Sequence, residues 1–116
     1  MKKTEVIDFS KLEGPVYTGR DRGEKLRELF KIDQLDSSDY AINVIIPDST
    51  YSISSSFFLG LFGPSIIKSG SRDTFFKHYH FLTNDFLKGI IDAHASRALQ
   101  DKNLFTEQWK LILKDI

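Results

Sequence analysis

The chain has 116 residues, of which 41% are hydrophobic and 28% charged, and this length and composition fit one globular domain. Its 16 lysines and arginines balance its 16 aspartates and glutamates, so no net charge attracts nucleic acid or an anionic membrane. Cysteine is absent, which excludes disulfides, thiolate metal sites and a cysteine nucleophile. No apolar stretch has the length of a signal peptide or a membrane span, so we expect a cytoplasmic protein.

The first third of the chain predicts two short strands and a helix. The strands are expected at 4–9 and 14–19, and the helix within 19–33. A polar loop at 34–39 follows the helix. The helix is amphipathic, because Leu26, Leu29 and Phe30 recur at helical spacing. Gly23 falls on the same face, where it is a candidate for close packing.

The middle third predicts a buried strand and a buried helix. The β-branched run at 41–46 is typical of a strand covered on both faces at the middle of a sheet. A serine-rich turn follows, and then an apolar helix from Ser55 or Ser56 to Lys68. We expect Pro64 to break or kink this helix, because it lacks an N–H and crowds the preceding turn.

The last third predicts a strand and two helices after a loop at 69–73. The strand is expected at 75–82, the first helix at 83–102 and the last helix at 104–116. Thr83 is the expected N-cap of the helix at 83–102, with Asp85 in its first turn.

The C-terminal segment supports two interpretations. Its apolar residues follow helical spacing at Phe105, Trp109, Ile112, Leu113 and Ile116. The alternation of Trp109, Leu111 and Leu113 keeps a strand open as the alternative.

Strands that alternate with helices predict an α/β fold, with helices packed on a mixed or parallel sheet. We expect a single domain over 1–116, in which 101–116 is a helical or strand extension.

The serine run at Ser54, Ser55 and Ser56 has two physical explanations. A serine at a helix N-cap satisfies a free backbone N–H, which stabilises the helix by about 1 kcal/mol. The same helix end favours negative charge, so a phosphoserine there would add about −1.5 to −2 charges and switch a binding surface. A small molecule or nucleotide held there with Arg20 or Arg22 is a further alternative.

Two stretches resemble the STAS-like domain family of unknown function. The stretch YSISSSFFLGLFG at 51–63 resembles the family signature of a strand, small residues, a Ser-Phe pair and an apolar helix. The matching residues are Ser55, Ser56, Phe57, Phe58, Phe62 and Gly63. Upstream, RGEKLRELF at 22–30 is similar to the family's helix motif, with Gly23, Glu24 and Arg27 in the expected positions. The motifs and the strand between them span roughly residues 5–100.

The resemblance implies a bacterial or phage protein with a STAS-like fold, a mixed sheet of about four strands with helices packed on it. It also implies a regulatory role, sometimes beside histidine-kinase-like ATPase domains. Members often carry acidic residues where this chain has Leu59 and Gly60, so functions that need those acids do not transfer. STAS domains such as anti-anti-sigma factors have Asp directly before the phosphorylated serine, and this chain has Ser54 at that position. Ser55 is the best match to the phosphorylated serine of those domains, and Ser56 is the second.

No enzyme, cofactor or metal is expected. His78 and His80 lie two apart, a spacing that ligates zinc on one face of a strand, but the other ligands are missing and His94 lies on a separate helix. Ser56 lacks the flanking glycines of a nucleophile elbow.

The sequence favours a non-enzymatic regulatory module that binds a protein, such as a kinase-like ATPase or regulator, through the surface from Ser54 to Phe58. Alternatives are a nucleotide or small-molecule sensor at the same helix end and a phage-borne inhibitor of a host protein. Self-association is a further prediction, through the apolar helix that contains Phe62 or through Trp109, because exposed apolar patches often mark contacts.

Overall fold

The computed structural model describes residues 3–100, so the predicted extension at 101–116 lies outside the described residues. The elements, in chain order, are β1 (Thr4–Asp8), the short 3-10 helix η1 (Phe9–Lys11), β2 (Val16–Tyr17), α1 (Arg20–Leu29), α2 (Ile32–Asp36), β3 (Ala41–Ile45), β4 (Ser52–Ile53), α3 (Ser55–Ser69), α4 (Arg72–His78), β5 (Tyr79–Leu82) and α5 (Asp85–Gln100). Within the described part of the chain, none of the helices is both long and apolar enough to cross a bilayer.

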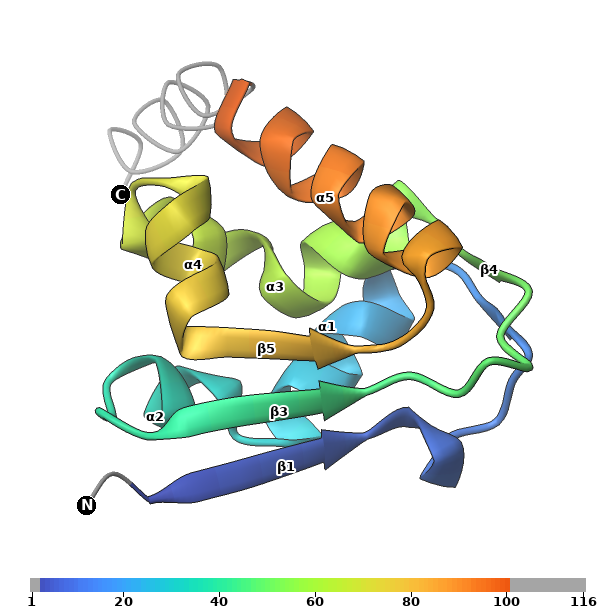
Figure 1. The fold of residues 1–116 in the computed structure, drawn as a ribbon, viewed down its shortest axis with the longest axis horizontal. Coiled ribbons are helices and arrows are strands. Elements are labelled where there is room, and N and C mark those ends of the chain that lie inside the picture. The colour runs from blue at the N-terminus through green and yellow to red at the C-terminus, as the bar shows by residue number, and fades with distance from the viewer. Residues whose placement is uncertain (1–2, 101–116) are drawn as a thin grey trace, which may run out of the picture.

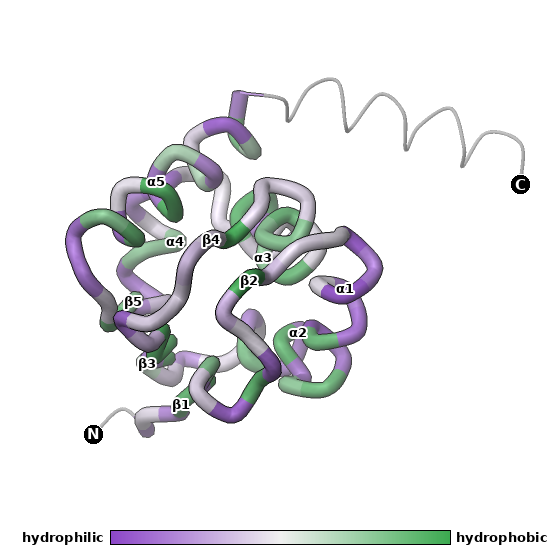
Figure 2. The backbone as a smooth tube through the Cα atoms, turned by 90° about the vertical axis from the view of Figure 1, so that its right-hand side faces the viewer, coloured by the Kyte–Doolittle hydropathy of each residue, from purple (hydrophilic) through white to green (hydrophobic). Residues whose placement is uncertain are grey.

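The fold is α/β, as predicted, but its strands form two sheets instead of one mixed sheet of about four strands. Strands β1, β3 and β5 make a parallel sheet in the order β1-β3-β5, and they lie side by side in Figure 1 with their arrows pointing the same way. Strands β2 and β4 pair in parallel with each other, away from that sheet (Figure 2). Each spans only two residues before the chain turns into a helix, so neither is long enough to extend the larger sheet.

Strand β3 is central, as predicted, but it is fully covered on one face only. Ile42 and Val44 are completely buried, whereas Ala41, Asn43 and Ile45 are half-buried. Helices α1, α2 and α3 lie on the same side of the sheet in Figure 2. The other face is partly open, which is unusual for a parallel sheet.

The helix predicted within 19–33 is interrupted, and the first half of the loop predicted at 34–39 is helical. Helix α1 ends at Leu29, Lys31 adopts a left-handed conformation with φ 55°, and α2 follows. The turn redirects the chain so that Ile32 enters the core with no exposed surface. Burial of this side chain outweighs the strain of one left-handed residue, a balance that helical periodicity does not reveal.

Pro64 does not break α3 (Ser55–Ser69), which runs through it without interruption. Eight residues of this helix are buried, five of them large apolar residues. Burial of one such side chain contributes about 1.5–3 kcal/mol, so together they exceed the cost of about 3 kcal/mol for an internal proline. Pro64 itself lies on the exposed side of the helix.

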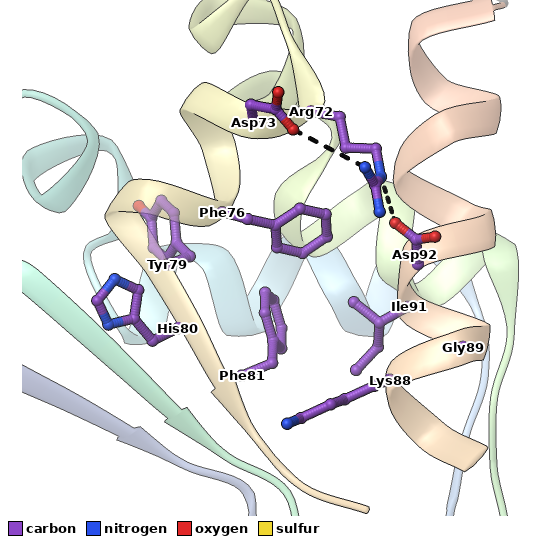
Figure 3. Close-up of a pocket in the computed structure, with 10 residues that line it drawn as sticks. All are labelled: Arg72, Asp73, Phe76, Tyr79, His80, Phe81, Lys88, Gly89, Ile91 and Asp92. Carbon is purple, nitrogen blue, oxygen red and sulfur yellow. Dashed lines mark hydrogen bonds and ion pairs between the residues drawn. The ribbon is translucent and has the colours of Figure 1, made fainter. Parts of the chain in front are cut away.

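The strand predicted at 75–82 is a strand only in its second half. Helix α4 occupies the first half, because Ser71 caps it by accepting a hydrogen bond from the Thr74 N–H at 3.1 Å. Phe75 is completely buried on this helix, with its ring 5.8 Å from that of Phe62. The chain then enters β5, so the rings of Phe76 and Phe81 come from different elements (Figure 3).

Helix α5 begins one residue later than predicted, and its cap is Asn84 instead of Thr83. The Asn84 side-chain oxygen accepts a hydrogen bond from the Leu87 N–H at 2.9 Å. The Thr83 hydroxyl is buried without a hydrogen-bond partner among the described residues.

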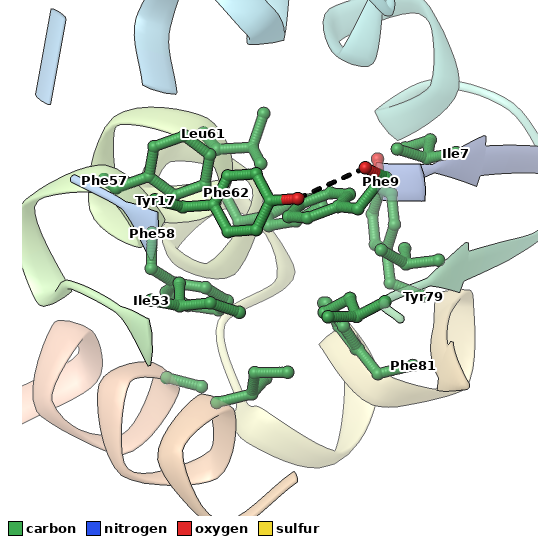
Figure 4. Close-up of a cluster of buried hydrophobic side chains, with 14 of the residues drawn as sticks. Ile7, Phe9, Tyr17, Ile53, Phe57, Phe58, Leu61, Phe62, Tyr79 and Phe81 are labelled. Carbon is green, nitrogen blue, oxygen red and sulfur yellow. Dashed lines mark hydrogen bonds between the residues drawn. The ribbon is translucent and has the colours of Figure 1, made fainter. Parts of the chain in front are cut away.

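The core is built around α3, which the other elements enclose. The rings of Phe57, Phe58 and Phe62 on this helix pack among rings from other elements, and Figure 4 shows them with Phe9, Tyr17, Tyr79 and Phe81. Of the apolar side chains predicted to leave this helix partly exposed for self-association, Phe57, Phe58, Leu61 and Phe62 are buried and Leu59 is partly buried. The helix is central and not one-sided, so it offers little exposed apolar surface, and self-association stays a prediction.

Candidate functional site

The serine turn joins β4 to α3, and Ser54 closes the end of the helix. Its Oγ accepts a hydrogen bond from the Phe57 N–H at 3.1 Å, which confirms a capping role for the serine run. The Ser54 N–H donates to the Tyr17 carbonyl of β2 at 2.9 Å. The helix end is therefore fixed on both sides, to its own first turn and to the neighbouring strand.

Ser55 and Ser56 have no such structural role. Ser55 is half-buried and Ser56 is exposed. Within residues 3–100, neither hydroxyl has a hydrogen-bond partner. The first turn of α3 contains no acidic residue, so the positive end of the helix dipole is not neutralised by its own sequence. Both hydroxyls thus lie where added negative charge is favourable.

Phe57 and Phe58 do not belong to this surface. Both side chains are buried in the core, and they cannot contact a partner while the domain is folded. The exposed apolar side chain nearest in sequence is that of Tyr51, which is 77% exposed. Val16 is also exposed, on strand β2, where it pairs with Ser52. Tyrosine is enriched at protein interfaces, and Tyr51 was not among the site residues predicted from the sequence.

The two arginines proposed for anion binding have different environments. Arg20 is exposed at the start of α1. Arg22 donates hydrogen bonds to the carbonyls of Val16, at 3.2 Å, and Glu13, and its guanidinium lies 5.1 Å from the Tyr17 ring. Arg22 therefore holds the segment before α1 in place, and only Arg20 remains available to an anion.

The two family-like motifs meet directly, at a crossing of α1 and α3. A Cβ at Gly23 would lie 2.9 Å from the Leu61 backbone nitrogen, and a Cβ at Gly60 would lie 3.2 Å from the Glu24 nitrogen. Neither position has room for a side chain. The predicted close-packing role of Gly23 is confirmed, and Gly60 is its counterpart on α3.

A buried polar cluster lies behind this crossing. The Arg27 guanidinium donates to the Asp36 carboxylate at 2.8 Å, to the Ser65 Oγ at 2.8 Å and to the Leu61 carbonyl at 2.9 Å. Tyr79 donates to the other oxygen of Asp36 at 2.6 Å. The cluster joins α1, α2, α3 and β5, and its polar groups satisfy one another, which indicates a structural role.

The phenol of Tyr79 is strongly held in its neutral form. Burial is the main cause that raises its pKa, and the hydrogen bond to Asp36 and the charge of that carboxylate add to it. Arg27 belongs to the upstream motif, whereas Asp36, Ser65 and Tyr79 could not be identified from the sequence, because they come from separate segments with no common pattern.

The histidines do not form the predicted pair on one strand. His78 ends α4, and its Nε2 lies 2.7 Å from the Leu35 carbonyl, whereas His80 is on β5 with Nε2 2.9 Å from the Lys77 carbonyl. His94 on α5 contacts the Ile53 carbonyl at 2.8 Å. Among the residues described, no group of three or more His, Asp or Glu side chains is arranged to hold a metal ion.

A groove that the sequence did not predict lies between α4, β5 and α5, with a cavity of about 620 Å³ (Figure 3). Its apolar wall includes Phe76, Phe81 and Ile91, and the ion pair of Arg72 with Asp92 crosses one end. This groove could not be predicted from the sequence, because the segment that forms most of α4 was predicted as a strand.

Comparison of the chain with family models, curated proteins and solved structures finds no match to any of them. The resemblance to the STAS-like family therefore depends on the motif residues alone.

Proposed function

We propose that this chain is a non-enzymatic, STAS-like regulatory module of the cytoplasm, which binds a protein partner through the exposed surface at the start of α3. This surface, the α3 cap surface, consists of Ser55 and Ser56 with the preceding Tyr51. The observation that carries the proposal is that neither hydroxyl has a hydrogen-bond partner among the described residues, at a helix end that Ser54 caps.

The direct packing of the two motifs supports the STAS-like assignment. Motif residues that are far apart in the sequence meet where Gly23 lies against α3, so the similarity concerns one joined substructure and not two isolated stretches. The observed division into a sheet of three strands and one of two means that the proposal concerns this substructure and not the whole sheet.

Electrostatics favour control of this surface by phosphorylation. A phosphate on Ser56 would lie in the first turn of a helix without acidic residues, where negative charge is stabilised by about 0.3–1 kcal/mol. Modification would then change the charge of the surface without unfolding the domain. Exposure favours Ser56 over Ser55 as the target, which reverses the order that the family motif suggests.

The nucleotide or small-molecule sensor is a weaker candidate. Arg22 already donates hydrogen bonds to backbone carbonyls. Of the two arginines proposed to bind an anion at the start of α3, only Arg20 would therefore be available to a phosphate. A nucleotide that raises the melting temperature by mass action would favour the sensor.

The test is affinity capture of partners from cells, with the wild-type chain compared with Ser56→Asp and Tyr51→Ala. We expect Ser56→Asp to change the retention of a specific partner, and Tyr51→Ala to weaken it about tenfold or more, since interface tyrosines often contribute above 1.4 kcal/mol. Ser49→Asp is the matched control, because Ser49 is an exposed serine in the loop before β4.

Equal capture by the wild type and by both cap-surface variants would reject the proposal. Thermal unfolding of each variant shows whether a loss of capture arises from unfolding instead, because all three positions are exposed and should tolerate substitution.

A further inference from the structure

The groove between α4, β5 and α5 continues into an exposed strip of α5. Gly89 and Ala93 are exposed on this helix, one turn apart, and a Cβ added at Gly89 meets no atom of residues 3–100 within 4 Å. Phe86, one turn earlier, is 70% exposed. Gly89 lines the groove as well, so the groove and this strip adjoin, and we call them together the α5 groove. Its apolar part is bordered by the charged side chains of Arg72, Asp73, Lys88 and Asp92.

The chain that follows α5 has the length to return along it. Sixteen residues follow Gln100, and their apolar side chains recur at helical spacing from Phe105 to Ile116. A helix over 104–116 would be about 20 Å long at about 1.5 Å per residue. The stretch of α5 from Gly89 to Gln100 is similar, about 18 Å.

We propose that residues 104–116 form an amphipathic helix that folds back against α5 and covers the α5 groove of the same chain. A short turn at 101–103 would make the two helices antiparallel, as is usual for helices joined by a few residues. In that arrangement Trp109 lies near Ala93 and Ile112 lies near the groove.

The chemistry of the two surfaces is complementary. The apolar stripe of 104–116 meets the apolar wall that includes Phe76, and burial of such side chains drives helices together. The small side chains on α5 let a second helix approach closely. At the far end, Asp115 comes within about one turn of Lys88, an exposed lysine on the rim of the groove.

The sequence allows a site-specific test, because the chain has one tryptophan and no cysteine. A bimane label on Ala93→Cys would be quenched by Trp109 only if the two approach each other. We expect lower emission from this protein than from the same labelled protein that also carries Trp109→Phe. Lys25→Cys on α1 is the matched label position, exposed and outside the groove, and it should show no such difference.

A second variant tests the groove itself. Gly89→Arg fills open space without contact with the core, so it should displace the segment, restore the bimane emission and shift the Trp109 fluorescence to longer wavelength. Leu29→Arg, an exposed apolar position on α1, should change neither signal.

Two results would overturn the proposal. The first is equal bimane emission with and without Trp109. The second is quenching that appears only when labelled Trp109→Phe protein is mixed with unlabelled wild type, because the segment would then occupy the groove of a second copy. Quenching independent of protein concentration supports docking within one chain.

Discussion

Asp36→Ala should be among the most destabilising single substitutions in the domain, because one carboxylate accepts hydrogen bonds from three donors. Oδ2 accepts from Arg27 and Ser65, each at 2.8 Å, and Oδ1 accepts from Tyr79 at 2.6 Å. The Asp36 side chain is 6% exposed and that of Arg27 is 11% exposed. Water therefore cannot replace the lost acceptor.

The magnitude follows from the partners that remain. Removal of one member of a buried ion pair typically costs about 3–5 kcal/mol, since the other charge stays buried and uncompensated. Arg27 keeps Asp33 at 2.6 Å, but that carboxylate is 88% exposed and such pairs contribute about 0–1 kcal/mol. We therefore expect a loss near the lower end, about 3 kcal/mol in the free energy of unfolding.

Tyr79→Phe removes one donor and leaves the others in place. The expected loss is about 1.5 kcal/mol, the lower end for a hydrogen bond to a charged group, because Asp36 keeps Arg27 and Ser65. The double variant Asp36→Ala, Tyr79→Phe lacks both the donor and the acceptor of this hydrogen bond, so neither group is left without its partner. Its loss in the free energy of unfolding should then be smaller than the sum of the two single losses by about 1 kcal/mol.

Urea denaturation followed by circular dichroism measures these differences from the shift in midpoint at constant slope. Asp33→Ala is the matched control, since it removes the exposed carboxylate from the same arginine and should cost no more than about 1 kcal/mol. If Asp36→Ala cost the same as this control, or if the two losses in the double variant simply added, the cluster would not act as one unit.

Four further predictions follow from other contacts. Thr83→Val should raise the free energy of unfolding by about 1 kcal/mol, because it removes a buried hydroxyl without a partner; a lower midpoint in urea would contradict this. Ser54→Ala should cost about 1 kcal/mol and Ser54→Asp much less, whereas Ser56→Asp should raise the melting temperature at low salt and lose this gain at high salt. Gly60→Ala should cost about 1–3 kcal/mol because its Cβ meets the backbone of α1, while Gly89→Ala, with open space around it, should stabilise by up to about 1 kcal/mol; similar effects at both sites would refute the close crossing. The Tyr79 pKa lies above its ordinary value of 10.0, so the unfolded chain releases this proton first and wild-type stability should fall above about pH 10, by up to about 1.4 kcal/mol per pH unit, with a shallower fall in Tyr79→Phe.

The sequence alone determined the features that depend on neighbouring residues. Alternating strands and helices gave the α/β class, and β3 was recognised from its β-branched run. The serine run predicted the start of α3 correctly, because capping needs only a hydroxyl that accepts a hydrogen bond from the backbone N–H three residues later. Gly23 was identified as a packing point from its place on the apolar face of α1.

Tertiary structure decided what depends on residues far apart in the chain. The motif around Phe57 could not show whether this side chain is exposed or buried. Its burial depends on α1, α4 and α5, which pack around α3 and cover it on nearly all sides. The cluster around Asp36 collects groups from four elements, and β2 and β4, which are far apart in the sequence, pair with each other instead of joining the larger sheet. Burial energy, summed over many distant contacts, outweighs local preference at Pro64 and Lys31, and for that reason these two features became visible only in the folded chain.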